Sequence, residues 1–223
     1  MADLTTVVAA TANEHKLAEI SAILSPLGYE VISRAAAGVP DFEIEETGET
    51  FEENSLLKAR VIYDWLEGRA WALADDSGIE ADALDGAPGV YSARFAQAGD
   101  LEDFAAAELN AEQSHRSLQD RANNKKLLRL LEGIPEGQRS ARFVSVITCL
   151  RPGKDPIVCR GEVEGKVDFS ETGIAGFGYD PLFIPTGYAY SFGLFKPEDK
   201  NALRHRGIAL KKLAKEFAED RSV

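Results

Sequence analysis

The sequence predicts an α/β fold, because short apolar segments with strand character alternate with segments of helical periodicity. The first thirty-odd residues show the pattern. Residues 6–10 form an apolar strand candidate, and apolar side chains then recur at helical spacing over residues 14–24. Residues 29–33 read as a second strand after the breakers Pro26 and Gly28. This strand, loop, helix and strand are typical of the start of an α/β sheet.

The same pattern continues along the chain. Thr50 and Glu53 form a capping box that predicts a helix ending near Leu66. Residues 100–132 have a helical composition, and a glycine-rich passage follows later, at 173–180. The remaining elements are strands at 142–150, 157–167 and 182–184, a turn at 151–156, and a last helix from near 197 to 217.

Length and charge narrow the function classes. The chain has 223 residues and a formal net charge of −12. Its length predicts a single domain over residues 1–223, which is either one large unit or two lobes around a cleft. The acidic balance argues against binding a nucleic-acid polymer, where basic surface dominates affinity. A small anion held by a few lysines and a metal remains compatible with it.

The two cysteines predict reduced thiols and not a disulfide framework. Cys149 and Cys159 flank the turn at 151–156, so we expect them on neighbouring strands of a hairpin. No secretory signal suggests an oxidising compartment, and no apolar run approaches the length of a membrane span. We therefore expect a cytoplasmic protein without a membrane partner.

Two adjacent carboxylates carry the strongest chemical signal. The apolar segment 70–74 ends in Asp75 and Asp76, and a Ser-Gly turn is expected to follow. Buried strands rarely end in paired acids unless a positive charge lies opposite, and Mg²⁺ is a natural partner. The alternative is a solvated turn, since Asp, Ser and Gly all favour turns. Glu45 and Glu46 precede the capped helix and could approach the pair.

Three further segments combine polar or basic residues with loops. The loop at 11–16 precedes a helix N-terminus and carries Lys16, which suits an anion, although Asn13 could serve only as an N-cap. At 176–181 two glycines flank Phe177, which suits either a stacked ligand or a tight turn around a core ring. The run at 200–207 is either a solvated basic face or an anion and base pocket.

Taken together, these segments resemble the non-canonical purine nucleoside triphosphate pyrophosphatase family, also called inosine triphosphate or dITP/XTP pyrophosphatases. The resemblance covers nearly the whole chain, and the motifs occur in the family's order. They are TANEHK at 11–16, EETGETFEENSLLKAR at 45–60, LADDSGIEADALDGAPGVYSARF at 73–95, GFGYDP at 176–181 and KNALRHRG at 200–207.

The resemblance implies a fold, a cofactor and a set of site residues. The implied fold is a long twisted mixed β-sheet with flanking helices and two lobes around the substrate cleft, in an Mg²⁺-dependent homodimer. Asp76 matches a proton acceptor and metal ligand, and Glu45 matches a second metal ligand, assisted by Glu46 and Asp75. The substrate-binding positions implied are Thr11, Asn13, Lys16, Ser77, Phe177, Gly178, Tyr179, Asp180, Lys200, His205 and Arg206.

The sequence also departs from the family pattern. The stretch 96–122 is longer and more irregular than in bacterial-type members, and residues 191–195 replace an Ala-Glu-Leu-like segment. The residue before the His-Arg pair is commonly Ser, whereas here it is Arg204. An additional cation beside the base pocket bears on base selectivity and not on the reaction class.

The resemblance implies hydrolysis of ITP, dITP or XTP to the monophosphate and pyrophosphate. Asp76 would orient or deprotonate the attacking water, or hold the metal. Arg206 and protonated His205 can only donate hydrogen bonds, so they could read the 6-oxo group of the base, while the alternative places Arg206 on the phosphates. Two other functions stay open: a nucleotide sensor without turnover, and a pyrophosphatase for another modified nucleotide.

Overall fold

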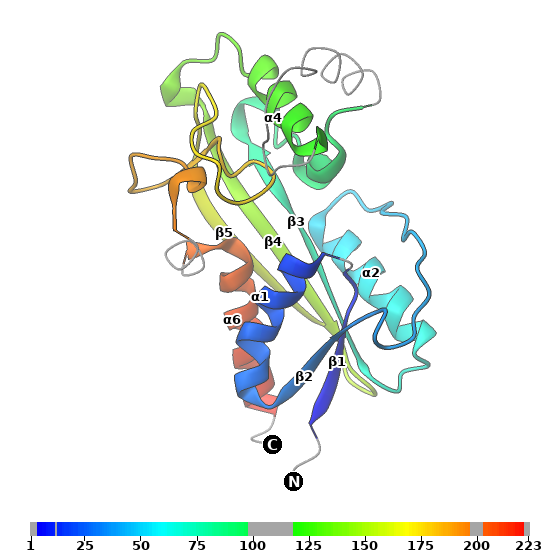
Figure 1. The fold of residues 1–223 in the computed structure, drawn as a ribbon. Helices are drawn as coiled ribbons and strands as arrows, with labels where there is room; N and C mark the ends of the chain where they lie inside the picture. The colour runs from blue at the N-terminus through cyan, green and yellow to red at the C-terminus, as the bar shows by residue number, and fades with distance from the viewer. Residues whose placement is uncertain (1–3, 12, 98–117, 197–202, 221–223) are drawn as a thin grey trace. The chain divides into compact units, whose positions relative to one another are not determined.

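The computed structural model describes residues 4–11, 13–97, 118–196 and 203–220 (Figure 1). Within them, one six-stranded sheet has the order β2-β1-β3-β4-β5-β6. Strand β1 pairs in parallel with β2 and β3, whereas β5 and β6 are antiparallel, so the sheet is mixed. The strands are β1 (Thr5–Ala9), β2 (Tyr29–Ser33), β3 (Trp71–Ala81), β4 (Ser140–Leu150), β5 (Ile157–Val167) and β6 (Phe183–Pro185).

Helices flank this sheet, which confirms the predicted α/β class. The capping box predicted at Thr50 is present, since its hydroxyl accepts from Glu53 N while the Glu53 carboxylate accepts from Thr50 N. The α-helices are α1 (Glu14–Leu24), α2 (Phe51–Trp65), α4 (Leu118–Leu130) and α6 (His205–Asp220). Short 3₁₀ turns occur at Ser25–Leu27, Asp82–Leu84, Gly89–Arg94, Glu136–Gln138 and Phe192–Leu194.

Most predicted elements lie where the periodicity placed them, with one difference near the chemistry. The strand expected to end at the paired acids continues through Asp75, Asp76 and the expected Ser-Gly turn as far as Ala81. The predicted turn is therefore wrong. The last helix is described from His205, and its predicted start near 197 lies outside the described residues, as does the part of the predicted 100–132 helix that precedes Leu118.

The chain divides into two compact units. The first unit comprises Met1–Ser77, Ser145–Gly161 and His205–Val223. The second unit comprises Gly78–Val144 and Glu162–Arg204. The substrate cleft between two lobes stays a prediction.

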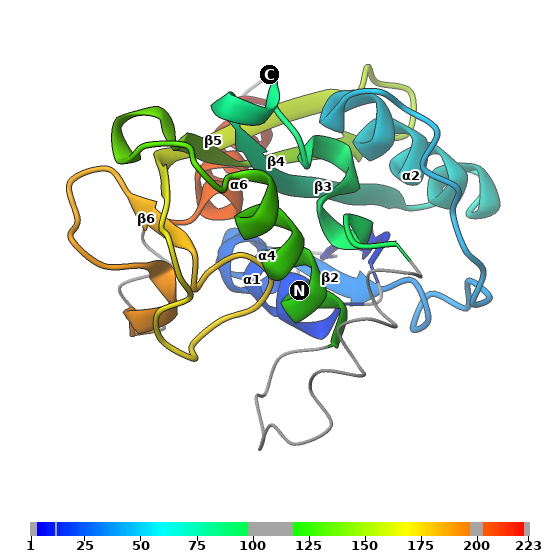
Figure 2. The same cartoon turned by 90° about the horizontal axis from the view of Figure 1, so that it is seen from above.

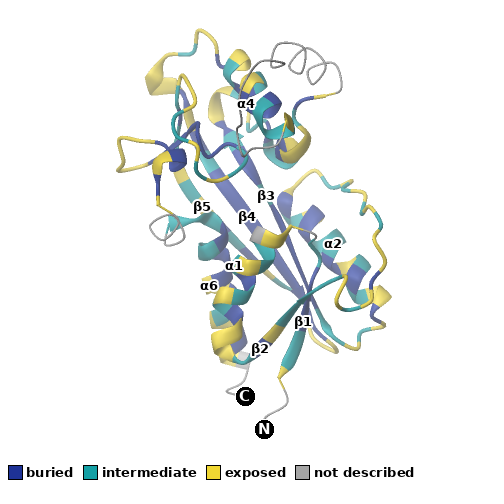
Figure 3. Cartoon of the chain, in the orientation of Figure 1, coloured by how far each residue is buried: buried dark blue, intermediate teal, exposed yellow. Residues whose placement is uncertain are grey.

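In the first unit, helices cover both faces of the strands. Figure 2 shows α1 and α2 on opposite sides of β3. Successive residues of a strand point to opposite faces, so Leu73 joins the core under α1 and α6 while Ala72 packs under α2. Strand β3 is accordingly largely buried, whereas the outer faces of these helices are exposed (Figure 3).

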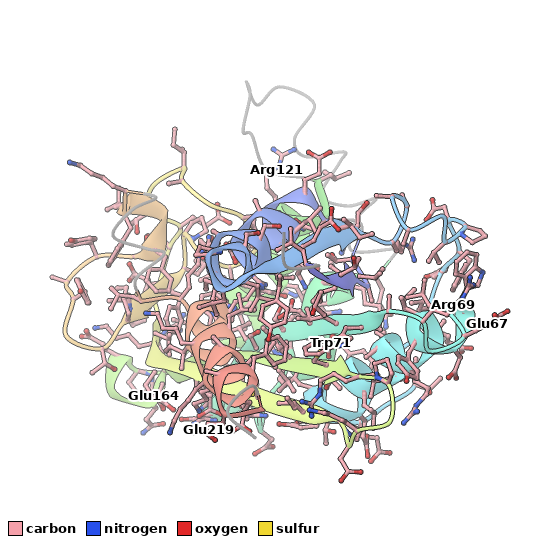
Figure 4. The ribbon with its side chains drawn as sticks, turned by 90° about the horizontal axis from the view of Figure 1, so that it is seen from below. Glu67, Arg69, Trp71, Arg121, Glu164 and Glu219 are labelled. Atoms are coloured by element: carbon pink, nitrogen blue, oxygen red, sulfur yellow. The ribbon has the colours of Figure 1, made fainter. Side chains whose placement is uncertain are left out.

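An aromatic cluster closes the first core at the start of β3. Trp71, labelled in Figure 4, lies with its ring centroid 5.5 Å from that of Tyr29 and 5.0 Å from that of Phe217 on α6. Both cysteines lie in the same core as free, buried thiols, as predicted. Burial raises the pKa of Cys149 to about 12 and raises that of Cys159 as well. Both thiols are therefore protonated at neutral pH.

The second unit has its own apolar core. It is built around Leu127 of α4, Phe143 of β4 and Phe183 of β6, and it includes the side chain of Tyr179. Gly78 of β3 allows the turn Gly89–Arg94 to approach the strand, because a Cβ there would lie 2.3 Å from Ser92 Oγ and 2.6 Å from the Gly89 carbonyl. Among the described residues, no helix is long and apolar enough to cross a membrane.

Candidate active site

Strand β3 carries the two acids to opposite faces. Asp75 lies under α1 and α6, whereas Asp76 faces α2, as expected for neighbouring residues of one strand. Each is only 6% exposed. Carboxylates are rarely buried without partners. The contacts on each face therefore decide whether β3 can continue through Asp75 and Asp76.

The first face is a network around Asp75. The ammonium of Lys16 lies 2.6 Å from Asp75 Oδ2, and Arg206 Nε lies 3.4 Å from the same oxygen. The other oxygen accepts from the Ser145 hydroxyl of β4 at 2.6 Å. Ser77, two residues along β3, accepts from Lys16 Nζ at 3.2 Å and from Arg206 Nη2 at 3.1 Å. Lys16, Asp75, Ser77 and Arg206 thus form one polar cluster.

The charges in this cluster follow from its composition. Burial by itself would raise the pKa of Asp75, but Arg206 and Lys16 outweigh it and hold the pKa well below its usual range. Lys16 has one carboxylate beside it and further cations nearby, so burial dominates and lowers its pKa. Asp75 is therefore ionised and serves as the shared counter-ion of Lys16 and Arg206.

Arg206 is the most deeply buried cation of the network, at 1% exposure. Its Nη1 donates to Glu19 Oε2 of α1 at 2.5 Å, which gives the guanidinium a second carboxylate. The first turn of α6 reaches this place because Gly161 of β5 has no side chain: a Cβ there would lie 2.2 Å from the His205 carbonyl. His205 is half-buried at the start of α6.

On the second face, Lys58 of α2 binds two carboxylates. Its ammonium lies 2.6 Å from Asp76 Oδ1 and 2.8 Å from Glu46 Oε1. Burial opposes the charge on Lys58, but Asp76 and Glu46 outweigh it and raise its pKa. Asp76 has only this cation against burial and two neighbouring acids, Glu46 and Asp75, so its pKa is raised.

A divalent cation fits this second face. Asp76 Oδ2 is buried and has no hydrogen-bond partner among the described residues. An unpartnered carboxylate oxygen in a buried position is costly, and a hard cation would satisfy it. No three His, Cys, Asp or Glu side chains of the described chain lie close enough to hold a metal between them. Mg²⁺ requires fewer, since it is commonly bound through one or two carboxylates plus substrate phosphates.

The loop before α1 combines the two roles considered for it. Asn13 Oδ1 accepts from the backbone N–H of Lys16 at 3.1 Å, which is an N-cap contact. Thr11 Oγ1 accepts from Asn13 N at 3.1 Å. The loop therefore presents Lys16 from the first turn of a capped helix, and a helix N-terminus favours anions. Binding of phosphate by Thr11 and Asn13 stays a prediction.

The glycine-rich segment belongs to the second unit. Its side chains differ in exposure: Phe177 is half-buried, while Tyr179 and Asp180 are buried. The Tyr179 hydroxyl donates to the Ser92 carbonyl at 2.8 Å, so this ring belongs to the core. Asp180 Oδ2 accepts from Phe177 N at 2.9 Å. Phe177 is thus the aromatic side chain of this segment that is left partly accessible.

The remaining predicted residues lie outside these networks. Glu45 is exposed, and Glu46 instead is the neighbour that approaches Asp76 through Lys58. Lys200 lies outside the described residues. The sequence reading missed Lys58, although a lysine three residues after Ser55 in so acidic a segment was a usable signal. It also missed Glu19 and Ser145, whose roles depend on contacts across the fold.

Comparison with known proteins identifies the family. The model of the Ham1 family matches residues 7–216. The chain belongs to the Ham1 family. This confirms the resemblance drawn from the five motifs, since the match spans all of them.

Several curated relatives and solved structures are similar over nearly their full length. The dITP/XTP pyrophosphatase of Desulforamulus reducens is 44% identical over 206 residues, which is 92% of each chain. That of Lactiplantibacillus plantarum is 40% identical over 215 residues, or 96% of this chain and 95% of the relative. The Ham1 protein of Staphylococcus aureus has a TM-score of 0.80 at 33% identity, covering 97% of this chain and 100% of that one. A Ham1 protein from Coxiella burnetii has the same TM-score and coverage at 35% identity.

Proposed function

We propose that this Ham1 protein hydrolyses non-canonical purine nucleoside triphosphates, such as ITP, dITP and XTP, to the monophosphate and pyrophosphate. Such a reaction cleanses the nucleotide pool. The observation that carries the proposal is the pair of buried carboxylates on β3, each held by a lysine. Relatives that are 40–44% identical bear the name dITP/XTP pyrophosphatase, which supports the same reaction.

The reaction requires water to attack the α-phosphorus while pyrophosphate leaves. Lys16 and the N-terminus of α1 are suited to the polyphosphate, because both favour negative charge. Asp75 is their counter-ion: it holds the Lys16 ammonium and the Arg206 guanidinium in place before substrate arrives. Preorganised charges of this kind need no reorganisation during reaction.

Asp76 is suited to the water. Its raised pKa makes it a stronger base than an ordinary aspartate, and its second oxygen is available for a proton or a cation. Lys58 holds the first oxygen and fixes the carboxylate. Asp76, and after it Glu46 on the other side of Lys58, outweigh burial and keep that ammonium charged.

A divalent ion is the implied cofactor, as is general among nucleotide pyrophosphatases. We assign it to Asp76 Oδ2 with help from the acidic segment, at Glu46 or at the predicted Glu45. When bound, Mg²⁺ would neutralise charge on the phosphates. Activity should vanish with excess EDTA and return with Mg²⁺, and full turnover in EDTA would contradict the assignment.

A nucleotide sensor is the competing class. Recognition alone would not need a buried carboxylate with an unpartnered oxygen, and this favours the enzyme. A homodimer is the assembly proposed from the family resemblance, and light scattering at micromolar concentration tests it.

The deciding experiment uses a panel of ITP, XTP, dITP, GTP and ATP with a colorimetric phosphate assay. We expect phosphate from ITP, dITP and XTP only when inorganic pyrophosphatase is added, because the direct product is pyrophosphate. Phosphate without that addition would indicate a phosphatase. Calorimetric binding of ITP without any turnover would indicate a sensor. Turnover confined to another nucleotide would indicate a pyrophosphatase with a different substrate class.

A further inference from the structure

Arg204 contacts the partly accessible aromatic ring of the second unit. Its guanidinium carbon lies 5.2 Å from the centroid of the Phe177 ring, within the range of a cation–π contact. Its Nη2 lies 3.7 Å from Asp180 Oδ2. The Arg204 side chain is 11% exposed, so both contacts are largely shielded from water.

Hydrogen bonds from other residues fix the backbone around Phe177. Asp180 Oδ2, the oxygen near Arg204, also accepts from Phe177 N. Asn124 of α4 donates to the Gly178 carbonyl at 3.1 Å, and the Tyr179 hydroxyl reaches the Ser92 carbonyl. These bonds fix the loop but leave the Phe177 side chain to be oriented by what touches its ring.

We propose that Arg204 is a positioning residue that holds the Phe177 ring as a platform for the purine base. The proposal rests on the proposed function and deepens it. A guanidinium against the ring restricts its rotation, and its ion pair with Asp180 connects the ring to the loop backbone. A preoriented platform binds the base without first losing rotamer freedom.

This role explains the departure of the sequence at this position. The residue before the His-Arg pair is commonly Ser in the resembling family, and a Ser side chain reaches neither the Phe177 ring nor the Asp180 carboxylate over these distances. In this chain the arginine supplies both contacts. Because the chemistry on β3 belongs to other residues, the effect should fall on substrate binding and not on turnover.

The test compares Arg204→Ser with the wild type on ITP and XTP. A cation–π contact of this kind corresponds to about 2- to 30-fold in an equilibrium constant, so we expect KM to rise within that range while kcat stays within about twofold. Arg204→Lys keeps a cation and should recover part of the loss. In a Phe177→Leu background, Arg204→Ser should raise KM little further, because the ring that Arg204 holds is already absent.

A matched control is available in the first unit. Arg34 also lies over a phenylalanine, with its guanidinium carbon 5.7 Å from the Phe42 centroid, and it also pairs with an aspartate, Asp41. Arg34→Ala should leave KM and kcat unchanged. It removes the same kinds of contact at residues that have no assigned role in the site, and thus controls for a general loss of stability.

Two kinetic results would overturn the proposal. One is a fall in kcat at constant KM in Arg204→Ser. The other is a rise in KM on Arg204→Ser that is equally large in the wild-type background and in the Phe177→Leu background. Calorimetric binding of inosine, which lacks phosphates, separates this proposal from the proposed function: weaker binding in Arg204→Ser supports the platform even if the wild type hydrolyses none of the triphosphates. Unchanged inosine binding would count against it.

Discussion

Lys58 Nζ lies 2.6 Å from Asp76 Oδ1, and this contact joins α2 to the buried acid of β3. It is what permits a carboxylate only 6% exposed to stand inside a strand. The same ammonium also binds Glu46, so Lys58 bridges two carboxylates of the first unit.

Lys58→Met should move the acidic limb of the pH profile of kcat/KM to higher pH. Burial raises the pKa of Asp76, and Lys58 opposes that rise. Without the ammonium the pKa rises further, so Asp76 becomes protonated, and inactive as base or ligand, at a higher pH. Lys166→Met is the control, because Lys166 pairs with Glu136 at the surface of the second unit. If the acidic limb of Lys58→Met lies at the same pH as that of the wild type, titration of Asp76 does not cause that limb.

Asp76→Asn should lower activity by about 10²- to 10⁴-fold, the usual loss on removing a general base, and any loss of metal binding adds to it. Folding should survive, since the change removes a buried charge with one unpartnered oxygen. Steady-state kinetics and a thermal melt measure the two effects. Asp155→Asn, at an exposed position in the β4–β5 turn, is the matched control. Activity within a few-fold of wild type would remove Asp76 from both roles.

Asp75→Asn should instead destabilise the fold, because it leaves the Lys16 and Arg206 charges buried without their shared carboxylate. Breaking a buried pair costs about 3–5 kcal/mol in free energy of unfolding. Urea denaturation measures the loss, and Asp41→Asn, which alters the pair between the exposed Asp41 carboxylate and Arg34, should change stability by less than about 1 kcal/mol.

The stability difference between the wild type and Asp75→Asn should depend on pH. The pKa of Asp75 is depressed in the folded state. Its contribution to stability is therefore complete above its unfolded pKa of about 3.9, and is lost as pH falls through the folded value. The gap in unfolding free energy between wild type and Asp75→Asn should be largest near neutral pH and narrow in acid. A constant gap would contradict the depressed pKa.

Arg206→Ala tests the two sequence-based roles of this arginine. Its described contacts are with Glu19, Ser77 and Asp75, which favours holding the phosphate-side network over reading the base. We expect kcat/KM to fall by a similar factor, about 10²-fold or more, on ITP, XTP, GTP and ATP. A loss concentrated on ITP and XTP would instead restore the 6-oxo reading. Glu19→Gln should show a weaker loss with the same proportions.

Local patterns determined much of this protein. Helix α1 begins and ends where the apolar spacing and Pro26 predicted, and α2 begins at its predicted capping box. These features depend on neighbours within a few residues, so one segment of sequence contains all the relevant physics. The five motifs likewise identified the family, because each is contiguous in the chain.

The tertiary structure decided the arrangement of charges. From sequence, Asp75 and Asp76 looked like the end of a strand beside a turn, since burying adjacent acids is unfavourable without partners. Those partners come from residues far along the chain: Lys58 is 18 positions from Asp76, and Arg206 is 129 positions from Ser77. With cations on both sides the strand continues, and its alternation sends the two acids to opposite faces. Contacts between distant segments set that outcome, so no local pattern contains it.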